Sequence, residues 1–386
     1  MSRTLFRTAA LLFSLLAAAP ALSQQAPPAS IPVPAPPQLA APSYLLLDFH
    51  SGHVLAEKAP DERRDPASLT KMMTAYVAFS ELRAGNMRLD EMVTVSEKAW
   101  RAPGSRMFIE VGKQVSVEDL LRGIIIQSGN DASIAIAEHI AGSESTFAQV
   151  MNTYAQRLGM NNSNFLNATG LPNPNHYVST RDVALLAAAL IRDFPEYYQW
   201  YSQKQFSFNG ITQYNRNKLL WRDPSVDGLK TGHTNAAGYC LASSAQQDDM
   251  RLVAVVMGTA SEKARADDSQ ALLNYGFRFF ETHRLYGASE ALSQARVWKG
   301  AREQLPLGLE QDLYVTIPRR QYDRLDASMS MESQIMAPVD AGSTLGKLVV
   351  RLGDTVLAER PLVALDPVKE GGLWQRLSDE VLLMFE

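Results

Sequence analysis

The sequence predicts an α+β protein with two folded domains and a terminal helix. Between residues 44 and 285, stretches with the two-residue alternation of strands are mixed with stretches whose apolar residues recur every three or four positions, as in helices. Between residues 286 and 368 strand-like alternation dominates, which predicts a small β-rich domain. The final stretch, 369–386, has the pattern of an amphipathic helix.

The N-terminus has the features of a secretory signal. Arg3 and Arg7 form a positive region, an apolar stretch follows, and a small-x-small cleavage site ends at Ser23. We therefore expect residues 1–23 to be removed during export to the periplasm, with a retained signal anchor as the alternative. Residues 24–43 are rich in Pro and Ala and predict an extended leader outside the core.

The first domain, 44–285, is expected to begin with a β-hairpin that turns at Ser51-Gly52. A helix follows from Ser68 to Gly85-Asn86. The stretch 115–142 predicts two helices, broken at Ser128-Gly129-Asn130. The later elements expected in this domain are a helix over 179–194, strands over 238–246 and 250–259, and a helix over 269–283.

The second domain, 286–368, is expected to contain a hairpin that turns at Gly353-Asp354. Beyond it lies the amphipathic helix, whose apolar side consists of Leu373, Trp374, Leu377, Val381, Met384 and Phe385. This side could lie on a membrane surface or pack on its own protein. Because Arg376 stands among acidic residues, attachment to a membrane would depend on apolar burial rather than on attraction to anionic lipid.

The composition excludes several classes of function. The formal net charge of −4 gives no electrostatic reason to expect nucleic acid as a partner. Cys240 is the single cysteine, so an internal disulfide and a cysteine-rich metal cage are excluded. The histidines lack metal-ligand spacing, and no H-E-x-x-H stretch occurs. We expect neither a metal nor another cofactor.

The stretch "DPASLTKMM" contains a serine and a lysine three residues apart, where a helix is expected to begin. Side chains at this spacing share a helix face, and a lysine with a depressed pKa can act as base for a serine nucleophile. Alone, Ser68 and Lys71 are compatible with an ordinary helix surface capped by Asp65. Two further stretches favour chemistry, because "QSGN" adds Ser128 and Asn130, and "DGLKTGHT" adds Lys230 and Thr231.

With these three motifs, the chain resembles the penicillin-binding, active-site-serine acyltransferases, and most closely the low-molecular-mass D-alanyl-D-alanine carboxypeptidases. The resemblance extends through "DPASLTKMMTAYV", "GIIIQSGNDAS", "NGITQYNRNKLLW", "VDGLKTGHTNAAGYCLASSA" and "LVAVVMGT". It covers roughly residues 44–283 strongly and the rest more loosely. It implies a penicillin-binding/serine β-lactamase-like catalytic domain, with an antiparallel sheet flanked by helices on both faces.

The resemblance also implies a role for each motif residue. Ser68 would attack the bond between the two terminal D-alanines of a peptidoglycan stem peptide, Lys71 would take its proton, and Ser128 would relay a proton to the leaving group. Substrate binding would fall to Asn130, Lys230, Thr231, Gly232, His233 and Arg265. The oxyanion would lie between the backbone N–H groups of Ser68 and His233. Gly123 matches a position associated with deacylation, and Arg216 is a candidate for the cleft rim or for a structural salt bridge.

Three alternatives remain at this stage. A β-lactamase of the same fold would carry E-x-x-L-N between the second and third motifs, whereas the stretch "NATGLPNPNHYVST" has no acid. We therefore expect β-lactams to be covalent inhibitors. A D,D-endopeptidase that cuts peptide crosslinks could use the same residues. A non-catalytic wall-binding protein would be expected to have lost at least one of them.

Overall fold

The computed structural model describes residues 33–385; the expected signal peptide and the first part of the leader lie outside this range. An antiparallel sheet of five strands forms the centre of the first domain, in the order β2-β1-β9-β8-β7. Its strands are β1 (Ser43–Asp48), β2 (Val54–Lys58), β7 (Val226–Thr234), β8 (Gly238–Gln247) and β9 (Met250–Thr259). The two strands predicted over 238–246 and 250–259 are confirmed as β8 and β9.

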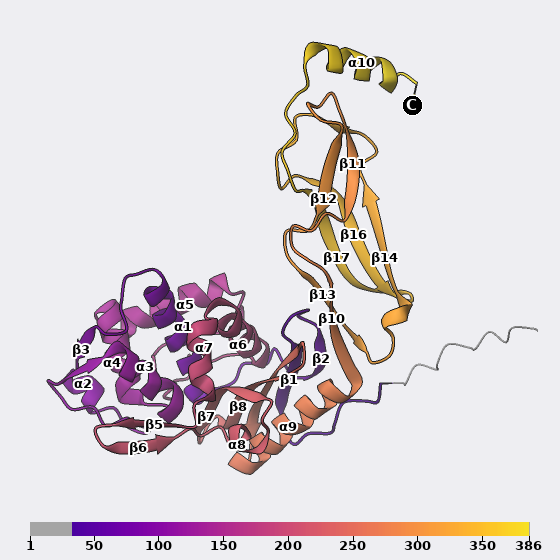
Figure 1. The fold of residues 1–386 in the computed structure, drawn as a ribbon. Helices are drawn as coiled ribbons and strands as arrows, with labels where there is room; N and C mark the ends of the chain where they lie inside the picture. The colour runs from indigo at the N-terminus through magenta and orange to yellow at the C-terminus, as the bar shows by residue number, and fades with distance from the viewer. Residues whose placement is uncertain (1–32, 386) are drawn as a thin grey trace, which may run out of the picture.

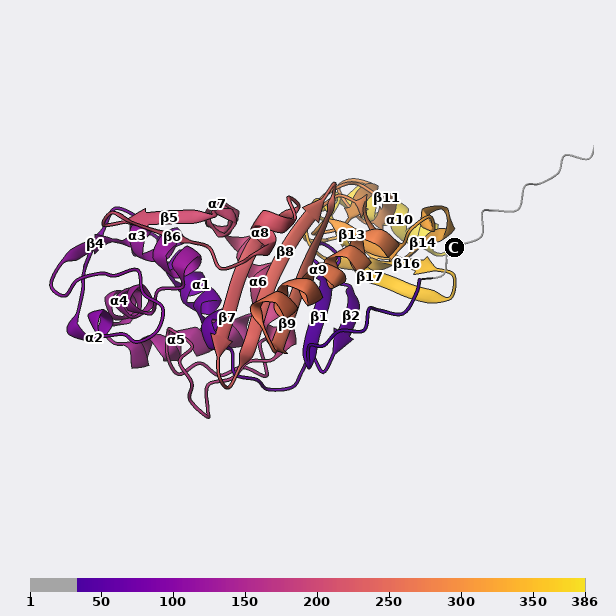
Figure 2. The same ribbon diagram turned by 90° about the horizontal axis from the view of Figure 1, so that it is seen from below.

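Helices cover both faces of this sheet, because strands β1 and β9 are apolar on both sides. Val253 and Val255 of β9 pack into the core on the side of most helices, whereas Leu252 and Ala254 pack into the core beneath the long helix α9. Figures 1 and 2 show the helical part beside the sheet and α9 (Glu262–Phe279) across the other face.

The helical part holds most of the residues between β2 and β7. Its helices are α1 (Thr70–Arg83), α2 (Glu97–Trp100), α3 (Val117–Arg122), α4 (Asn130–Ala141), α5 (Glu144–Arg157), α6 (Thr180–Asp193) and α7 (Pro195–Tyr198), with the short turns η1 (Ala67–Leu69), η2 (Gly123–Gln127) and η3 (Gln199–Ser202). The short helix α8 (Leu219–Arg222) instead packs into the core beneath α9. Two small hairpins, β3 (Met92–Thr94) with β4 (Gln114–Ser116) and β5 (Gln205–Phe208) with β6 (Ile211–Tyr214), complete it.

The break predicted between the two helices of 115–142 is confirmed. Helix α3 continues into the π-helical turn η2, the chain turns at Ser128 and Gly129, and α4 begins at Asn130. Gly142 then ends α4 with a φ of 73°, a left-handed conformation that glycine adopts without a steric penalty.

Several predicted boundaries differ from the structure. Ser68 lies in the 3-10 turn η1 rather than in α1, and no side chain caps that turn, so Asp65 is not its cap. The helix predicted over 269–283 begins earlier, where Ser261 caps α9, and it ends at Phe279. Phe280–Tyr286 is instead strand β10, because it pairs with β13 (Leu313–Pro318). The proposed domain boundary after residue 285 falls one residue before the end of this strand.

Residues 33–42 of the Pro/Ala-rich leader contain no helix or strand, whereas its last residue, Ser43, begins β1. The stretch 33–42 packs on α9. Its Ala41 N–H donates to Asp268 Oδ2 at 3.0 Å, and the Pro34 carbonyl accepts from the Tyr275 hydroxyl at 3.1 Å. Ala41 is fully buried. This packing was not expected from the composition of the leader, since it depends on contacts with a helix more than 200 residues away in the chain.

The second domain stands as a column on the first, with α10 (Leu373–Leu383) at its far end (Figure 1). Its strands form the β10-β13 ladder and a sheet of six in the order β14-β16-β17-β12-β11-β15. The remaining elements are β11 (Ser293–Trp298), β12 (Gln304–Gly308), η4 (Tyr322–Arg324), β14 (Leu325–Met331), β15 (Ile335–Met336), β16 (Thr344–Leu352) and β17 (Thr355–Ala364).

A buried polar network joins the two domains. Asp48, fully buried at the end of β1, accepts hydrogen bonds from the N–H and hydroxyl of Ser51 at 2.7 and 2.8 Å. Its other oxygen accepts from Thr282 Oγ1 of β10 at 2.7 Å. Thr316 of β13 lies within hydrogen-bond distance of both Ser51 and Thr282. The network therefore fastens the first hairpin of the catalytic domain to the base of the column.

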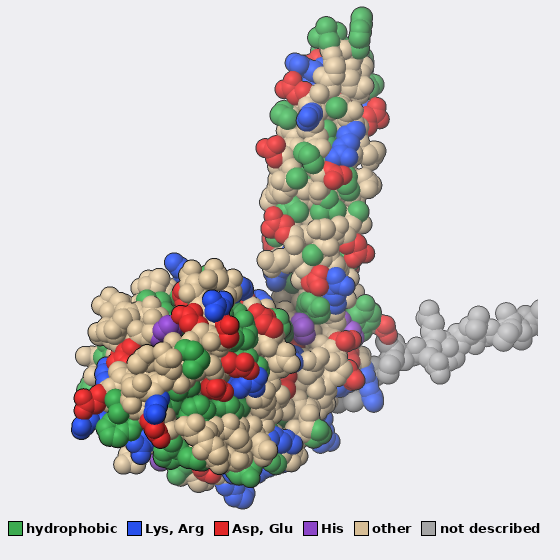
Figure 3. All heavy atoms as spheres, turned by 60° about the vertical axis from the view of Figure 1, so that its left-hand side comes forward, with side chains coloured by type: hydrophobic (Ala, Val, Ile, Leu, Met, Phe, Trp, Pro, Cys, Tyr) green, Lys and Arg blue, Asp and Glu red, His purple; other side chains and the backbone are tan. Residues whose placement is uncertain are grey.

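Helix α10 is held by its polar side. Asp379 is buried and accepts the backbone N–H of Lys299 at 2.5 Å, while Glu380 pairs with the Lys299 side chain. The apolar side predicted from the sequence faces solvent, with Trp374 and Phe385 each 85% exposed. Figure 3 shows hydrophobic side chains at this tip of the molecule. None of the helices within residues 33–385 has the length and hydropathy needed to span a bilayer.

Candidate active site

Ser68 and Lys71 meet at the beginning of α1. Lys71 Nζ donates hydrogen bonds to Ser68 Oγ at 3.1 Å, to Asn130 Oδ1 at 2.7 Å and to the Thr169 carbonyl at 2.6 Å. The side chain is among the most deeply buried in the protein, with 1% of the residue exposed. As an ammonium, Lys71 donates to all three acceptors, whereas the neutral amine can donate to Asn130 and Thr169 and turn its lone pair to the Ser68 hydroxyl.

The surroundings of Lys71 shift it toward its neutral form. Burial, assisted by the positive charge of Arg216, lowers the pKa of Lys71 to about 7, whereas the acidic side chains of Asp131 and Glu144 act in the opposite direction. A lysine with this pKa is neutral in about half of the molecules at neutral pH. It can therefore accept a proton from the serine hydroxyl at its side.

Ser128 projects into the site from the break between η2 and α4. Its φ of 69° is left-handed, which is uncommon for a residue with a side chain and is often found at functional positions. The Ser128 Oγ is buried and has no hydrogen-bond partner among the described residues. A buried hydroxyl without a partner is available to a ligand.

Asn130 connects this break to the loop 103–109. Its N–H donates to the Ser105 carbonyl at 2.7 Å, and its Nδ2 donates to the Pro103 carbonyl at 2.6 Å. Since its Oδ1 accepts from Lys71, the Asn130 side chain is fixed at both ends, and one hydrogen of the amide remains for a substrate.

Strand β7 forms the opposite wall. A Cβ on Gly232 would lie 3.0 Å from the Pro66 carbonyl and 3.3 Å from the Ser68 N, so only glycine lets the strand approach the serine this closely. The Gly232 carbonyl accepts from Arg265 Nη1 at 3.2 Å. His233 stacks on Tyr239 of β8, with ring centroids 3.9 Å apart.

Lys230 lies deeper than Thr231 in the same strand. Its Nζ donates to the Thr231 carbonyl at 3.0 Å. Burial, together with the charges of Lys71, Arg216 and Arg265, holds the pKa of Lys230 well below the usual range of a lysine. Lys230 therefore contributes to the electrostatics of the site from below its surface.

These elements enclose a cavity of about 380 Å³. It is lined by Ser68, Gly104, Ser105, Ser128, Asn130, Thr169, Gly170, Leu171, Arg216, Thr231, Gly232, His233, Thr234, Tyr239, Glu262 and Arg265. The lining contains one acidic side chain, Glu262, and two arginines, so its charge is positive. The predicted site residues are thus brought together, with Lys71 and Lys230 outside the lining itself. The cavity favours an anionic ligand.

Arg216 lies in this cavity, and no ion pair of its guanidinium within 4.0 Å is present among residues 33–385. The interpretation of Arg216 as half of a structural salt bridge is therefore not supported. Sequence reasoning missed the Thr169 carbonyl, Tyr239 and the loop 103–109. A backbone carbonyl leaves no side-chain signal, and the loop has no motif of its own.

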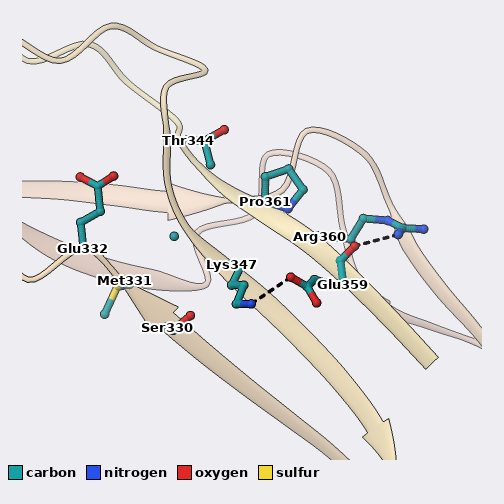
Figure 4. Close-up of a pocket in the computed structure, with 9 residues that line it drawn as sticks. Ser330, Met331, Glu332, Thr344, Lys347, Glu359, Arg360 and Pro361 are labelled. Atoms are coloured by element: carbon teal, nitrogen blue, oxygen red, sulfur yellow. Dashed lines mark hydrogen bonds and ion pairs between the residues drawn. The ribbon is translucent and has the colours of Figure 1, made fainter. Parts of the chain in front are cut away.

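A second hollow, of about 590 Å³, lies on the β-rich domain between β14, β16 and β17 (Figure 4). Its charged side chains include the Lys347–Glu359 ion pair, at 3.0 Å. No lysine in its lining lies beside a serine hydroxyl as Lys71 does, so the smaller cavity is the candidate active site. Among the described residues, no cluster of three His, Cys, Asp or Glu side chains could hold a metal ion.

The active-site-serine acyltransferases are defined by a serine and a buried lysine at the start of a helix. A second serine and a strand that carries another lysine lie around this pair. The chain belongs to the D-alanyl-D-alanine carboxypeptidase family, whose model matches residues 31–261. A second model, penicillin-binding protein 5, C-terminal domain, matches residues 280–370. The chain is thus a serine-type peptidase with an α+β catalytic domain and a C-terminal β-rich domain.

Similar proteins cover nearly the whole chain. D-alanyl-D-alanine carboxypeptidase DacA of Escherichia coli (strain K12) is 43% identical over 361 residues, covering 92% of this chain and 90% of the relative. DacC of the same organism is 44% identical over 357 residues, covering 90% and 89%. Penicillin binding protein 5 from Haemophilus influenzae matches with a TM-score of 0.84 and 43% identity, covering 87% of this chain and 99% of that structure.

A more distant solved structure is similar to part of the chain. Penicillin-Binding Protein D2 from Listeria monocytogenes, in the ampicillin-bound form, matches with a TM-score of 0.59 and 28% identity. The match covers 63% of this chain and all of that structure. This part of the chain therefore shares its fold with a protein whose structure was solved with a β-lactam bound.

Proposed function

We propose that this chain is a D-alanyl-D-alanine carboxypeptidase that removes the terminal D-alanine from peptidoglycan pentapeptide stems through an acyl-enzyme on Ser68. The observation that carries the proposal is the 3.1 Å contact between Lys71 Nζ and Ser68 Oγ, with the pKa of Lys71 lowered to about 7 by burial. The family relationship supports the substrate class.

Acylation follows from this geometry. Ser68 Oγ attacks the carbonyl carbon of the penultimate D-alanine while neutral Lys71 accepts the hydroxyl proton. The oxyanion forms between the N–H groups of Ser68 and His233, which the close approach of Gly232 supports. When the C–N bond breaks, the proton passes through Ser128 Oγ to the departing nitrogen. D-Alanine leaves, and an ester remains on Ser68.

The anionic end of the substrate fits the positive side of the cavity. Its terminal carboxylate would bind Thr231 and Lys230, with Arg265 as a further cation at the same end of the cavity. The remaining amide hydrogen of Asn130 would donate to a backbone carbonyl of the stem peptide.

Deacylation completes the cycle without a further group. Water attacks the ester carbonyl, Lys71 accepts a proton from that water, and the proton returns to Ser68 Oγ as the ester bond breaks. The one carboxylate in the cavity lining, Glu262, pairs with Arg265 at 3.7 Å, and the stretch in which a β-lactamase would carry E-x-x-L-N has no acid. β-Lactams should therefore form a long-lived acyl-enzyme and act as covalent inhibitors.

We further propose that residues 1–23 direct export to the periplasm, that 44–285 and 286–368 are the catalytic and β-rich domains, and that 369–386 attaches the protein peripherally to the outer face of the inner membrane. The exposed apolar side of α10 supports this attachment, with Leu373, Trp374 and Phe385 each at least 70% exposed. Binding should depend on apolar burial and change little with salt. Sedimentation with neutral phosphatidylcholine vesicles, for the full chain and a Trp374→Ser/Phe385→Ser variant, tests it. Equal sedimentation would refute it.

The reaction is tested by incubating the mature protein with diacetyl-Lys-D-Ala-D-Ala and measuring released D-alanine, with Ser68→Ala as control. We expect release that disappears in the variant. Labelling of Ser68 by fluorescent penicillin without release would favour the D,D-endopeptidase, and a crosslinked muropeptide would then be the next substrate. Neither labelling nor release would overturn the enzymatic proposal and leave a wall-binding protein.

A further inference from the structure

Asp131 makes an unusual set of contacts directly after the Ser128–Asn130 break. Its carboxylate is buried, with 1% of the residue exposed. It accepts the backbone N–H groups of three successive residues, Met107 at 3.0 Å, Phe108 at 2.9 Å and Ile109 at 3.3 Å, and that of Ala132 at 2.9 Å. Hydrogen bonds to an ionised carboxylate are stronger than those between neutral groups, so the end of the loop 103–109 is anchored at this one side chain.

The backbone of the loop is shaped around this carboxylate. Phe108 has a left-handed φ of 68°, a conformation that a residue with a large side chain adopts only where its surroundings impose it. Met107 occupies the space next to Gly123, where any Cβ would overlap its sulfur. A Cβ on Gly129 would lie 2.9 Å from Asp131 Oδ1. The loop, the turn η2 and the Asp131 carboxylate therefore fit together without spare room.

The other end of the loop holds Asn130 and faces the cavity. The carbonyls of Pro103 and Ser105 accept from the Asn130 side chain and backbone, and Gly104 and Ser105 line the cavity. Asn130 Oδ1 in turn accepts from Lys71 Nζ at 2.7 Å. A continuous series of contacts thus runs from Asp131 through the loop and Asn130 to Lys71.

We propose that Asp131 is a positioning residue of the active site, whose carboxylate fastens the loop 103–109 to the helix break and so holds Asn130 against Lys71. The proposal rests on the function proposed above. It adds a residue outside the three motifs to the machinery, and it assigns to the loop the role of a support for Asn130.

The charge of Asp131 also acts on Lys71. The titratable and charged groups that face Lys71 are Asp131 of α4, Glu144 of α5, His176 and Arg216 of two loops, and Lys230 of β7. Asp131 raises the pKa of Lys71 against the larger effect of burial. Without this negative charge, and with a less firmly held Asn130 oxygen, the ammonium form loses stabilisation, so the Lys71 pKa should fall further.

The experiment measures the rate of Ser68 acylation by fluorescent penicillin across pH, for the wild type, Asp131→Asn and Asp131→Glu. For Asp131→Asn, we expect the acylation rate to fall about 10- to 100-fold, because a displacement of about 1 Å in an active site can lower a rate by this much. We also expect the acid limb of the pH–rate profile, where the rate falls as the base becomes protonated, to move to lower pH. Asp131→Glu keeps the charge but moves the oxygens, so its rate should fall while its acid limb stays in place.

Asp48→Asn is the matched control, because Asp48 is an equally buried carboxylate with three hydrogen bonds at the domain junction, outside the cavity. It should lower the unfolding temperature but leave the acid limb unchanged. The proposal is overturned if Asp131→Asn acylates within about twofold of wild type, or if Asp48→Asn moves the acid limb as far as Asp131→Asn does.

A measurement on the wild type covers the case in which Asp131→Asn does not fold. The amides of Met107, Phe108 and Ile109 should exchange slowly with deuterium, although Phe108 as a residue is 46% exposed. Exchange as fast as in an open surface loop would contradict the anchoring. Because acylation by penicillin and amide exchange need no D-alanine release, these results stay separate from the test of the proposed function.

Discussion

The pH dependence of acylation should depend on Arg216, although this residue does not contact Ser68 by a hydrogen bond. An ordinary lysine with a pKa near 10.5 is neutral at pH 7 in about one molecule in 3,000, whereas Lys71, with a pKa of about 7, is neutral in about half. The lowered pKa thus raises the fraction of active base by about 10³-fold. Burial is the largest cause, and Arg216 is the next.

Replacing Arg216 by Gln removes a positive charge that disfavours the Lys71 ammonium, so the Lys71 pKa should rise. The acid limb of acylation by fluorescent penicillin, followed from about pH 5 to about pH 9, should then move to higher pH. The position of the limb is the readout, because weaker binding of an anionic ligand would lower the rate at every pH without moving it.

Lys218→Gln is the matched control, since Lys218 is an exposed cation two residues away that does not line the cavity. Its acid limb should coincide with that of the wild type. A limb that stays in place or moves to lower pH in Arg216→Gln would refute the assignment of Lys71 as the base whose pKa Arg216 lowers. A wild-type rate with no acid limb near pH 7 would refute the lowered pKa itself.

Three further predictions follow from close contacts and burial. Gly123→Ala should displace the buried Met107 and lengthen the lifetime of the penicilloyl-enzyme about tenfold. Gly372→Ala is the control, because its Cβ would lie in open space and should leave the lifetime unchanged. Equal lifetimes in Gly123→Ala and the wild type would contradict the prediction. Gly232→Ala should slow acylation about 10- to 100-fold, because its Cβ would press on Pro66 and Ala67; an unchanged rate would show that the approach of β7 is not needed. In the unfolded chain Lys71 binds its proton up to about pH 10.5 and in the folded chain only to about pH 7, so stability should rise with pH between these values. The increase in the free energy of unfolding attributable to Lys71 is at most about 5 kcal/mol, and it should be missing when Lys71→Met is unfolded by denaturant. If the free energy of unfolding changed equally with pH in the variant and the wild type, this would contradict the lowered pKa of Lys71.

Much of the local structure could be predicted from the sequence. Gly142 ends α4 where its left-handed preference indicates, and the run 250–259 forms a strand buried on both faces. The helix break at Ser128-Gly129 was also predictable, because Ser and Gly favour turns over helix interiors. These features depend on neighbours in the sequence, so the pattern of residues is sufficient to predict them.

The errors occurred where distant contacts decide the outcome. The stretch "FRFFETH" suits a helix or a strand equally, and pairing with residues 313–318 makes its end a strand. The composition of residues 33–42 predicts an extended linker. In the structure this stretch packs on α9, because Asp268 and Tyr275 provide hydrogen-bond partners for its backbone. Neither contact leaves a local signal in the sequence.

The sequence by itself determined which residues we propose to carry the chemistry: the serine and lysine of the first motif, the serine and asparagine of the second, and the lysine and threonine of the third. Only the tertiary structure decided the pKa of Lys71. Its side chain is that of any lysine, and its pKa near 7 arises because segments around residues 103, 130 and 169 close over it and exclude water. The charged form loses more from this exclusion of water than the neutral form, so packing gives a common residue the pKa that the proposed role of base requires.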